Sequence, residues 1–161
     1  MAVVDGGGTA AVRMPEAVSG PAVLHEAGAA FSPEDLRRYA QASGDHNPLH
    51  LDPAFARRAG FDGLVVHGML NMARLGRMLT RHFDAGSIRG FGARFESVLL
   101  VGQATTIGMS LTGYEGGVAR VALLMRAQDG RRIVSGHADV RLSEEELLRR
   151  FRPALHSPVE S

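Results

Sequence analysis

The amino-acid sequence predicts an α+β domain in which an antiparallel sheet covers one face of a long apolar helix. Two observations support this class. The first half carries helix-capping signals and a long apolar helical segment, and from residue 88 onward apolar residues alternate with a period of two. A chain of 161 residues suits one domain with a sizeable core. We place that domain at residues 21–152, between a flexible arm at 1–20 and a flexible tail at 153–161.

The first helix is expected within residues 31–44. Ser32 is a suitable N-cap, Pro33 suits the first helical position, and Asp35 stands where a capping box places an acid. The helix should end near Gly44, because glycine is favoured just past a helix C-terminus.

Residues 45–66 are expected to form a loop that contains two short helical turns. Asn47-Pro48 and Asp52-Pro53 each pair a capping residue with a proline at the first helical position. One turn should therefore end at residue 51 and the other near residue 59.

A long helix is predicted from the run HGMLNMARLGRMLTRHF, residues 67–83. Its polar residues form a narrow stripe, and apolar residues cover most of the remaining surface, so the helix should be buried on several sides. The small residues Ala73 and Gly76 should allow a close approach to a sheet. The expected polar stripe consists of Asn71, Arg74, Arg77 and Arg81.

The second half is predicted to form an antiparallel meander of four strands. Glycine-containing breaks at 115–117 and 129–130 separate the later strands, and Asp-Gly between strands is a strong hairpin signal. Ser143 and Glu146 are expected to cap a short C-terminal helix. The open edges of such a sheet favour pairing across a subunit interface. The strands are expected within residues 87–100, 103–113, 118–128 and 131–142.

The composition argues against several functional classes. With 18 Lys and Arg against 17 Asp and Glu, the formal net charge of +1 gives no reason to expect nucleic acid or a membrane surface as partner. The absence of cysteine excludes disulfides, thiolate catalysis and cysteine-ligated zinc. The first 20 residues lack the features of a secretory signal, and no apolar run approaches the length of a membrane span. We therefore expect a cytoplasmic protein.

The polar loop SGDHNPLHLDP, residues 43–53, has three interpretations. A metal site has possible ligands in Asp45, His46, His50 and Asp52. However, a new turn begins between the two histidines, and neither the HExxH pattern nor a calcium-loop pattern is present. Capping explains Asn47 and Asp52 but leaves Asp45 and His50 unexplained.

Acid–base chemistry is the third interpretation of this loop. Asp45 and His50 flank a proline-locked turn, which is able to aim a carboxylate and an imidazole at one small volume. Hydration of a double bond needs a group that polarises water and a group that supplies a proton at carbon. On chemistry alone, catalytic and structural roles for this pair carry equal weight.

The start of the long helix adds a candidate anion site. The N–H groups at a helix N-terminus lack partners and carry partial positive charge, and Gly68 permits close approach of a ligand. Such donors would stabilise a thioester oxygen as it gains enolate charge. The alternative is that Gly68 only eases a tight entry into the helix.

The run SGDHNPLHLDPAFARRAGFDGLVVHGML resembles the motif of the (R)-specific enoyl-CoA hydratases, the MaoC-like dehydratases. Their hallmark is an Asp-x-Asn-Pro-x-His run followed by a His-Gly-Met helix start, and both parts are present here at the right spacing. More weakly, the resemblance extends over residues 22–142.

This resemblance implies a hot-dog fold, with the sheet wrapped around the long helix, and a homodimer or higher oligomer with active sites near the subunit interface. It implies that Asp45 and His50 are the catalytic pair, that the Gly68 N–H belongs to an oxyanion hole, and that Asn47 supports the catalytic turn. The implied reaction is the reversible hydration of trans-2-enoyl thioesters to (R)-3-hydroxyacyl thioesters. No metal or redox cofactor is expected, since CoA or phosphopantetheine belongs to the substrate.

Some positions depart from the family pattern, and rival functions stay open. Glu96 and Gln103 replace a commonly found proline and acid. Well-studied members carry a serine midway along the long helix, where this chain offers Gly76, with Asn71 and Thr80 as the only neutral polar groups. The rivals are a dehydratase acting on carrier-protein-bound or specialised 3-hydroxyacyl thioesters, a non-catalytic acyl-thioester-binding subunit, and a thioesterase. Ser135 lacks a nucleophile-elbow pattern, and the glycines at 6–8 precede no strand–helix unit, which disfavours a serine hydrolase and a phosphate loop.

Overall fold

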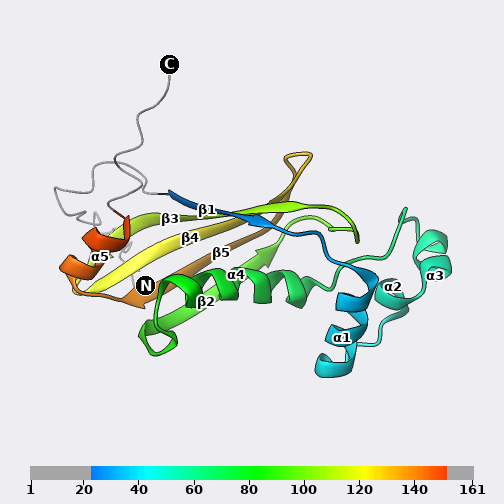
Figure 1. Ribbon diagram of the computed structural model, residues 1–161, viewed down its shortest axis with the longest axis horizontal. Coiled ribbons are helices and arrows are strands. Elements are labelled where there is room, and N and C mark those ends of the chain that lie inside the picture. The colour runs from blue at the N-terminus through cyan, green and yellow to red at the C-terminus, as the bar shows by residue number, and fades with distance from the viewer. Residues whose placement is uncertain (1–22, 152–161) are drawn as a thin grey trace, which may run out of the picture.

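The computed structural model describes residues 23–151. The expected arm at 1–20 and tail at 153–161 lie outside the described residues, as do the first and last positions of the expected domain at 21–152. Within the described part, an antiparallel sheet lies along one side of a long helix, α4, Gly68–His82 (Figure 1). The helices α1, α2 and α3 gather near one end of α4, and α5 lies at the opposite end (Figure 1).

The sheet has five strands in the order β1-β3-β4-β5-β2, which corrects the prediction of a four-stranded meander. Only β3, β4 and β5 form a meander, because β2 pairs with β5 at the far edge of the sheet. The strand β1 was not predicted, because its inward positions offer only one large apolar side chain, Leu24. The bounds are Val23–Gly28 (β1), Ile88–Phe95 (β2), Thr105–Glu115 (β3), Val118–Ala127 (β4) and Arg132–Arg141 (β5).

The turns between the central strands follow the predicted glycine positions. Gly116 and Gly117 have φ values of 57° and 78°, and a two-residue turn with positive φ at both positions matches the twist of the flanking strands. Gly130, with φ of 85°, closes the next hairpin. On β3, the buried residues alternate with more exposed ones, which confirms the predicted period of two.

The helix boundaries near the polar loop match their sequence signals. Ser32 and Asp35 form a reciprocal capping box at the start of α1, and Gly44 ends the helix with φ of 77°. Ser143 and Glu146 form the expected capping contacts at the start of α5. The helices are α1 (Pro33–Ser43), α2 (Pro48–Leu51), α3 (Pro53–Arg58) and α5 (Glu144–Phe151), and a short 3₁₀ helix spans Ala85–Ser87.

The long helix α4 is buried on one face in this chain, not on several sides as predicted. Met69, counted among the apolar residues of the helix, is 54% exposed, whereas Asn71, assigned to the polar stripe, is only 3% exposed. Gly76 does approach the sheet, since a Cβ built there would lie 3.4 Å from Phe91, but Ala73 is exposed. Helical periodicity gives the directions of these side chains relative to one another around the helix axis, but contact with the sheet decides which side of the helix faces inward.

The core lies between this face of α4 and the sheet. Leu75, Met78 and Leu79 of the helix pack in one cluster with side chains of the three central strands, including Met109, Leu123 and Val134. Within residues 23–151, no helix is long and apolar enough to cross a membrane.

Candidate active site

The two short turns of the polar loop are capped as the sequence predicts. Asn47 Oδ1 accepts a hydrogen bond from the Leu49 N–H at 3.0 Å, and Asp52 Oδ1 accepts from the Ala54 and Phe55 N–H groups at 2.8 and 3.2 Å. These backbone donors lower the pKa of the Asp52 carboxyl. Asn47 and Asp52 therefore have structural roles, and Asn47 supports the turn that carries the next residue of interest, His50.

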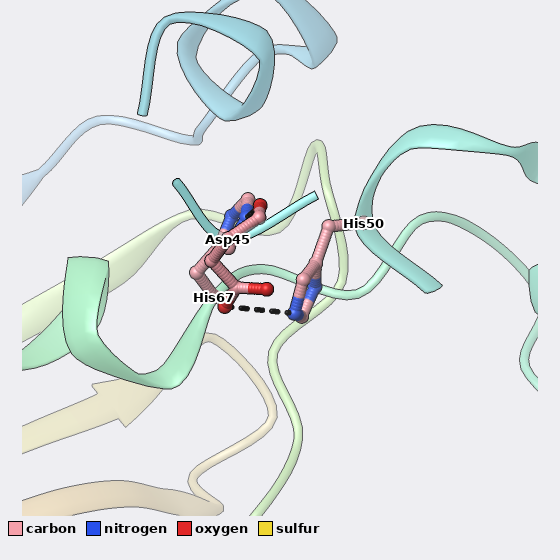
Figure 2. Close-up of side chains that lie close together, drawn as sticks. All are labelled: Asp45, His50 and His67. Carbon is pink, nitrogen blue, oxygen red and sulfur yellow. Dashed lines mark hydrogen bonds and ion pairs between the residues drawn. The ribbon is translucent and has the colours of Figure 1, made fainter. Parts of the chain in front are cut away.

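Asp45 and His50 lie at the two ends of the Asn47 turn and face each other (Figure 2). The distance from Asp45 Oδ2 to His50 Nε2 is 3.9 Å, which is too long for a direct hydrogen bond. The Asp45 side chain is 49% exposed and the His50 side chain 11% exposed. The pair that the sequence left between catalytic and structural roles is thus brought together around one small volume.

The tautomer of His50 follows from its second nitrogen. Nδ1 lies 2.7 Å from the carbonyl oxygen of Val65, and because a carbonyl only accepts, Nδ1 carries the hydrogen and donates it. Val65 is itself fixed, since its N–H donates to the Leu49 carbonyl at 3.1 Å. In neutral His50, the free lone pair is therefore on Nε2, the atom that faces Asp45.

A second histidine, His67, joins this pair and was not predicted as a site residue. Its Nε2 lies 3.1 Å from the backbone carbonyl oxygen of Asp45, and its ring stacks on the His50 ring with centroids 3.8 Å apart and an interplanar angle of 30°. Burial lowers the pKa of the His67 imidazole. The position of His67 immediately before the start of the long helix could have indicated a site residue. We interpreted this histidine only as part of the family motif.

Gly68 begins α4 beside this cluster. The first intrahelical bonds at this end run from the Leu70 and Asn71 N–H groups to the His67 carbonyl, which leaves the Gly68 and Met69 N–H groups without partners among residues 23–151. A Cβ built at Gly68 would come no closer than 3.5 Å to the Phe95 ring, an ordinary contact. Packing within this chain therefore does not require glycine here, which argues against the simple helix-entry explanation.

A pocket of about 320 Å³ connects His50 with the start of α4. Its walls are largely apolar, but the buried amide of Asn71 also lines it, and the Oδ1 atom of that amide has no hydrogen-bond partner among residues 23–151. The remaining lining residues are Val65, Val66, Gly68, Phe95, Glu96, Ser97, Val98 and Leu99. Such a pocket suits an apolar group attached to a polar reacting centre.

Asp45, His50 and His67 lie close enough together to hold a metal ion, but two features of the cluster disfavour one. Possible ligand atoms of Asp45, His50 and His67 lie within 4.8 Å of one another, whereas the sequence candidates His46 and Asp52 are not part of this group. The lone pairs of an imidazole lie in the plane of its ring, so two stacked rings do not point them at a common ion. The Nε2–H of His67 is also engaged with the Asp45 carbonyl.

Comparison with known proteins shows the family to which the chain belongs. A family model described as "MaoC like domain" matches residues 16–127. The chain is 33% identical over 116 residues to the (R)-specific enoyl-CoA hydratase of Aeromonas caviae, an alignment that covers 70% of this chain and 87% of that protein. It is 42% identical over 72 residues to the mitochondrial 3-hydroxyacyl-[acyl-carrier-protein] dehydratase of Arabidopsis thaliana, covering 45% of this chain.

The length of the match differs among these relatives. The alignments span 43% of the Arabidopsis protein and 5% of the fatty acid synthase beta subunit TOXC of Cochliobolus carbonum, to which this chain is 34% identical over 113 residues. The chain therefore corresponds to less than half the length of these two relatives.

Solved structures show the same fold. The (R)-hydratase from A. caviae involved in PHA biosynthesis superposes with a TM-score of 0.68 at 27% identity, covering 80% of this chain and all of that one. The unliganded R-hydratase PhaJ1 from Pseudomonas aeruginosa gives a TM-score of 0.70 at 24% identity, with 79% and 83% of the two chains covered. The chain belongs to the MaoC-like domain family and has the hot-dog fold that its motif implied.

Proposed function

We propose that this chain is a hydro-lyase that adds water reversibly to trans-2-enoyl thioesters and forms (R)-3-hydroxyacyl thioesters. One observation carries the proposal: the acceptor atoms Asp45 Oδ2 and His50 Nε2 face each other across 3.9 Å. The Gly68 N–H, which has no partner among residues 23–151, lies at the same pocket as His50. The A. caviae relative is named for this activity.

The gap between Asp45 and His50 has the chemistry and the width to hold one water. Oδ2 is an acceptor when the carboxyl is ionised, and Nε2 is an acceptor in the tautomer that Val65 imposes. A water about 2.8 Å from each atom donates one hydrogen to each of them. Its lone pairs then point away from both groups, toward the substrate carbon that is to be attacked.

The reaction balances without any further reactant. The water oxygen forms a bond to C3 of the enoyl thioester, one water proton moves to the Asp45–His50 pair, and that pair returns a proton to C2 on the same face. The intermediate charge resides on the thioester oxygen, which the Gly68 N–H and the positive end of α4 stabilise.

No metal or redox cofactor takes part in this scheme, because hydration changes no net oxidation state and the helix N-terminus supplies the positive charge. CoA or phosphopantetheine enters as part of the substrate. The apolar wall of the pocket accommodates the acyl group.

We also propose a homodimer whose second copy covers this site. Three large apolar residues around Gly68 are exposed in the single chain: Met69 at 54%, Phe95 at 49% and Val98 at 39%. An apolar rim of this kind is typical of a surface that is covered in the assembled protein. A covered rim would also exclude bulk water and strengthen the hydrogen bonds at the reacting centre.

The direct test is turnover of crotonyl-CoA, followed by the loss of enoyl absorbance, with the product analysed for the (R) configuration. Asp45→Asn and His50→Ala should each lose most of the activity, while His46→Ala serves as a matched control because His46 is an exposed neighbour outside the cluster. Undiminished turnover in either of the first two variants would overturn the catalytic assignment.

The main rival is a dehydratase for carrier-protein-bound thioesters, which the name of the Arabidopsis relative favours. Comparing CoA and carrier-protein thioesters of equal chain length separates the two by kcat/KM. A non-catalytic acyl-binding subunit would bind the thioester without turnover, and a thioesterase would release free thiol. We expect turnover without thiol release.

A further inference from the structure

His67 is the most deeply buried group of the cluster, and the proposed reaction leaves it without a role. It is only 1% exposed, and its Nδ1 has no hydrogen-bond partner among residues 23–151. A buried polar atom without a partner typically costs about 1–3 kcal/mol. As the residue before α4, His67 also makes no side-chain capping bond that would explain its presence.

Both members of the catalytic pair contact His67. Its Nε2–H donates to the backbone carbonyl of Asp45, a bond that joins residues 22 positions apart. Within the described part of the chain, the other hydrogen bonds of Asp45 reach only Ser43 and Asn47, two residues away on either side. His67 thus connects the exposed Asp45 segment to the start of the buried helix, while its ring supports the face of His50.

The surroundings of His67 favour its uncharged form. Because the Asp45 carbonyl accepts from Nε2, neutral His67 has its bare lone pair on Nδ1, and protonation would place an N–H there with no acceptor. Desolvation is the largest effect on the pKa of His67 and lowers it. The hydrogen bond to the Asp45 backbone raises this pKa by less, positive charge on His50 lowers it, and the Asp45 charge raises it least. The Tyr39 ring also lies against His67, with the two ring centroids 4.8 Å apart.

We infer that His67 is a positioning residue that maintains the 3.9 Å gap between Asp45 and His50: its Nε2–H holds the Asp45 main chain, and its uncharged ring supports His50. The inference rests on the proposed function, because the width of the gap matters only if the gap holds the reacting water. An uncharged support leaves His50 free to gain a proton during the reaction, whereas a charged one would oppose it.

Two substitutions separate the hydrogen bond from the ring. His67→Gln places an amide N–H near the position of Nε2 but removes the ring, and His67→Phe keeps a ring but removes the donor. A misplacement of about 1 Å at a reacting centre typically costs on the order of 100-fold in rate. We expect His67→Phe to lower kcat on crotonyl-CoA by about 10- to 100-fold with little change in KM, and His67→Gln to recover part of that loss.

A purely structural role predicts different results. Equal kcat in His67→Phe and wild type, or a loss in both variants that follows a loss of folded protein in thermal melts, would overturn the inference. An equal loss of kcat in both variants at unchanged melting temperature would also overturn the inference, because the hydrogen-bond donor would then make no difference to the rate.

A second measurement does not depend on turnover. Imidazole ¹⁵N shifts of the folded wild-type protein, assigned with the His67→Gln variant, should show His67 as the neutral Nε2–H tautomer at pH 7, with its titration midpoint below the ordinary histidine value. Titration of His67 near the ordinary histidine value of about 6.5, or an Nδ1–H tautomer, would overturn the inference. If His67 shows the expected tautomer but the wild type lacks hydratase activity, the proposed function fails while the assigned geometry stands.

Discussion

Replacing Gly68 by alanine separates the two explanations of this glycine. A methyl group there would meet the Phe95 ring at 3.5 Å, an ordinary van der Waals distance, and the residue has no positive φ that would strain alanine. Alanine also has a better helix propensity than glycine by about 0.8–1.0 kcal/mol in a helix interior. The fold should therefore tolerate Gly68→Ala without loss of melting temperature.

Activity should respond differently from stability. The added methyl group would extend from the residue whose N–H we assign to the thioester oxygen, into the pocket that His50 lines. Removing one oxyanion donor typically lowers kcat by about 100- to 1,000-fold, equivalent to about 2.7–4 kcal/mol. Because the methyl group obstructs the donor without deleting it, we expect a loss of kcat/KM near the lower end of that range, about 100-fold.

The assay is crotonyl-CoA hydration over a range of substrate concentrations, alongside a thermal melt of each protein. Gly86→Ala is the matched control, because a Cβ at that position would meet nothing within 4 Å and lies away from the pocket residues. Gly68→Ala with wild-type kcat/KM would refute the role of the Gly68 N–H. A fall in activity matched by a fall in melting temperature would instead support a packing role.

Three further results are expected. Asn71→Leu should raise the free energy of unfolding by about 1–3 kcal/mol in denaturant titrations, because it removes a buried amide oxygen that has no hydrogen-bond partner among residues 23–151. A less stable variant would mean that this amide oxygen is hydrogen-bonded in solution. Hydrogen bonds from Ser32 lower the pKa of Asp35 in the folded protein. The ionised carboxylate therefore stabilises the fold above about pH 4, and this contribution is lost as the pH falls through the lowered pKa. Asp35→Asn should accordingly lower the free energy of unfolding at pH 6 much more than at pH 3. Met69→Lys should shift the mass measured by light scattering from dimer toward monomer, whereas the control Gln41→Lys, at an exposed position of α1, should not. An unchanged mass in Met69→Lys would contradict the proposed dimer interface.

Much of the local structure around the site could be predicted from short-range sequence signals. The caps at Ser32, Asn47 and Asp52, with their following prolines, gave the bounds of α1, α2 and α3 within a residue or two. These signals are reliable because a capping side chain satisfies N–H groups two or three residues away, so both partners are visible in one stretch of sequence.

The order of the strands in the sheet could be predicted only in part, because it depends on contacts between segments that are distant in the sequence. The period of two in β3 and the glycine turns predicted the β3-β4-β5 meander, but nothing local specifies that β2 pairs with β5 or that β1 pairs with β3. Those pairings join distant segments, and β1 has too few apolar residues to be recognised as a strand from the sequence. The inward face of α4 was misassigned at Asn71 for a similar reason, because only contact with the sheet chooses that face.

For the site, the sequence by itself determined which residues stand on the rigid turn and which glycine begins the long helix. It did not decide between a catalytic and a structural role for Asp45 and His50 on chemistry alone. The tertiary structure decided three things: the 3.9 Å gap between them, the His50 tautomer set by the Val65 carbonyl, and the presence of His67 between the turn and the helix. The His50–Val65 and His67–Asp45 contacts join residues 15 and 22 positions apart along the chain, and their separation is fixed only when α4 packs on the sheet and brings its N-terminus to the loop.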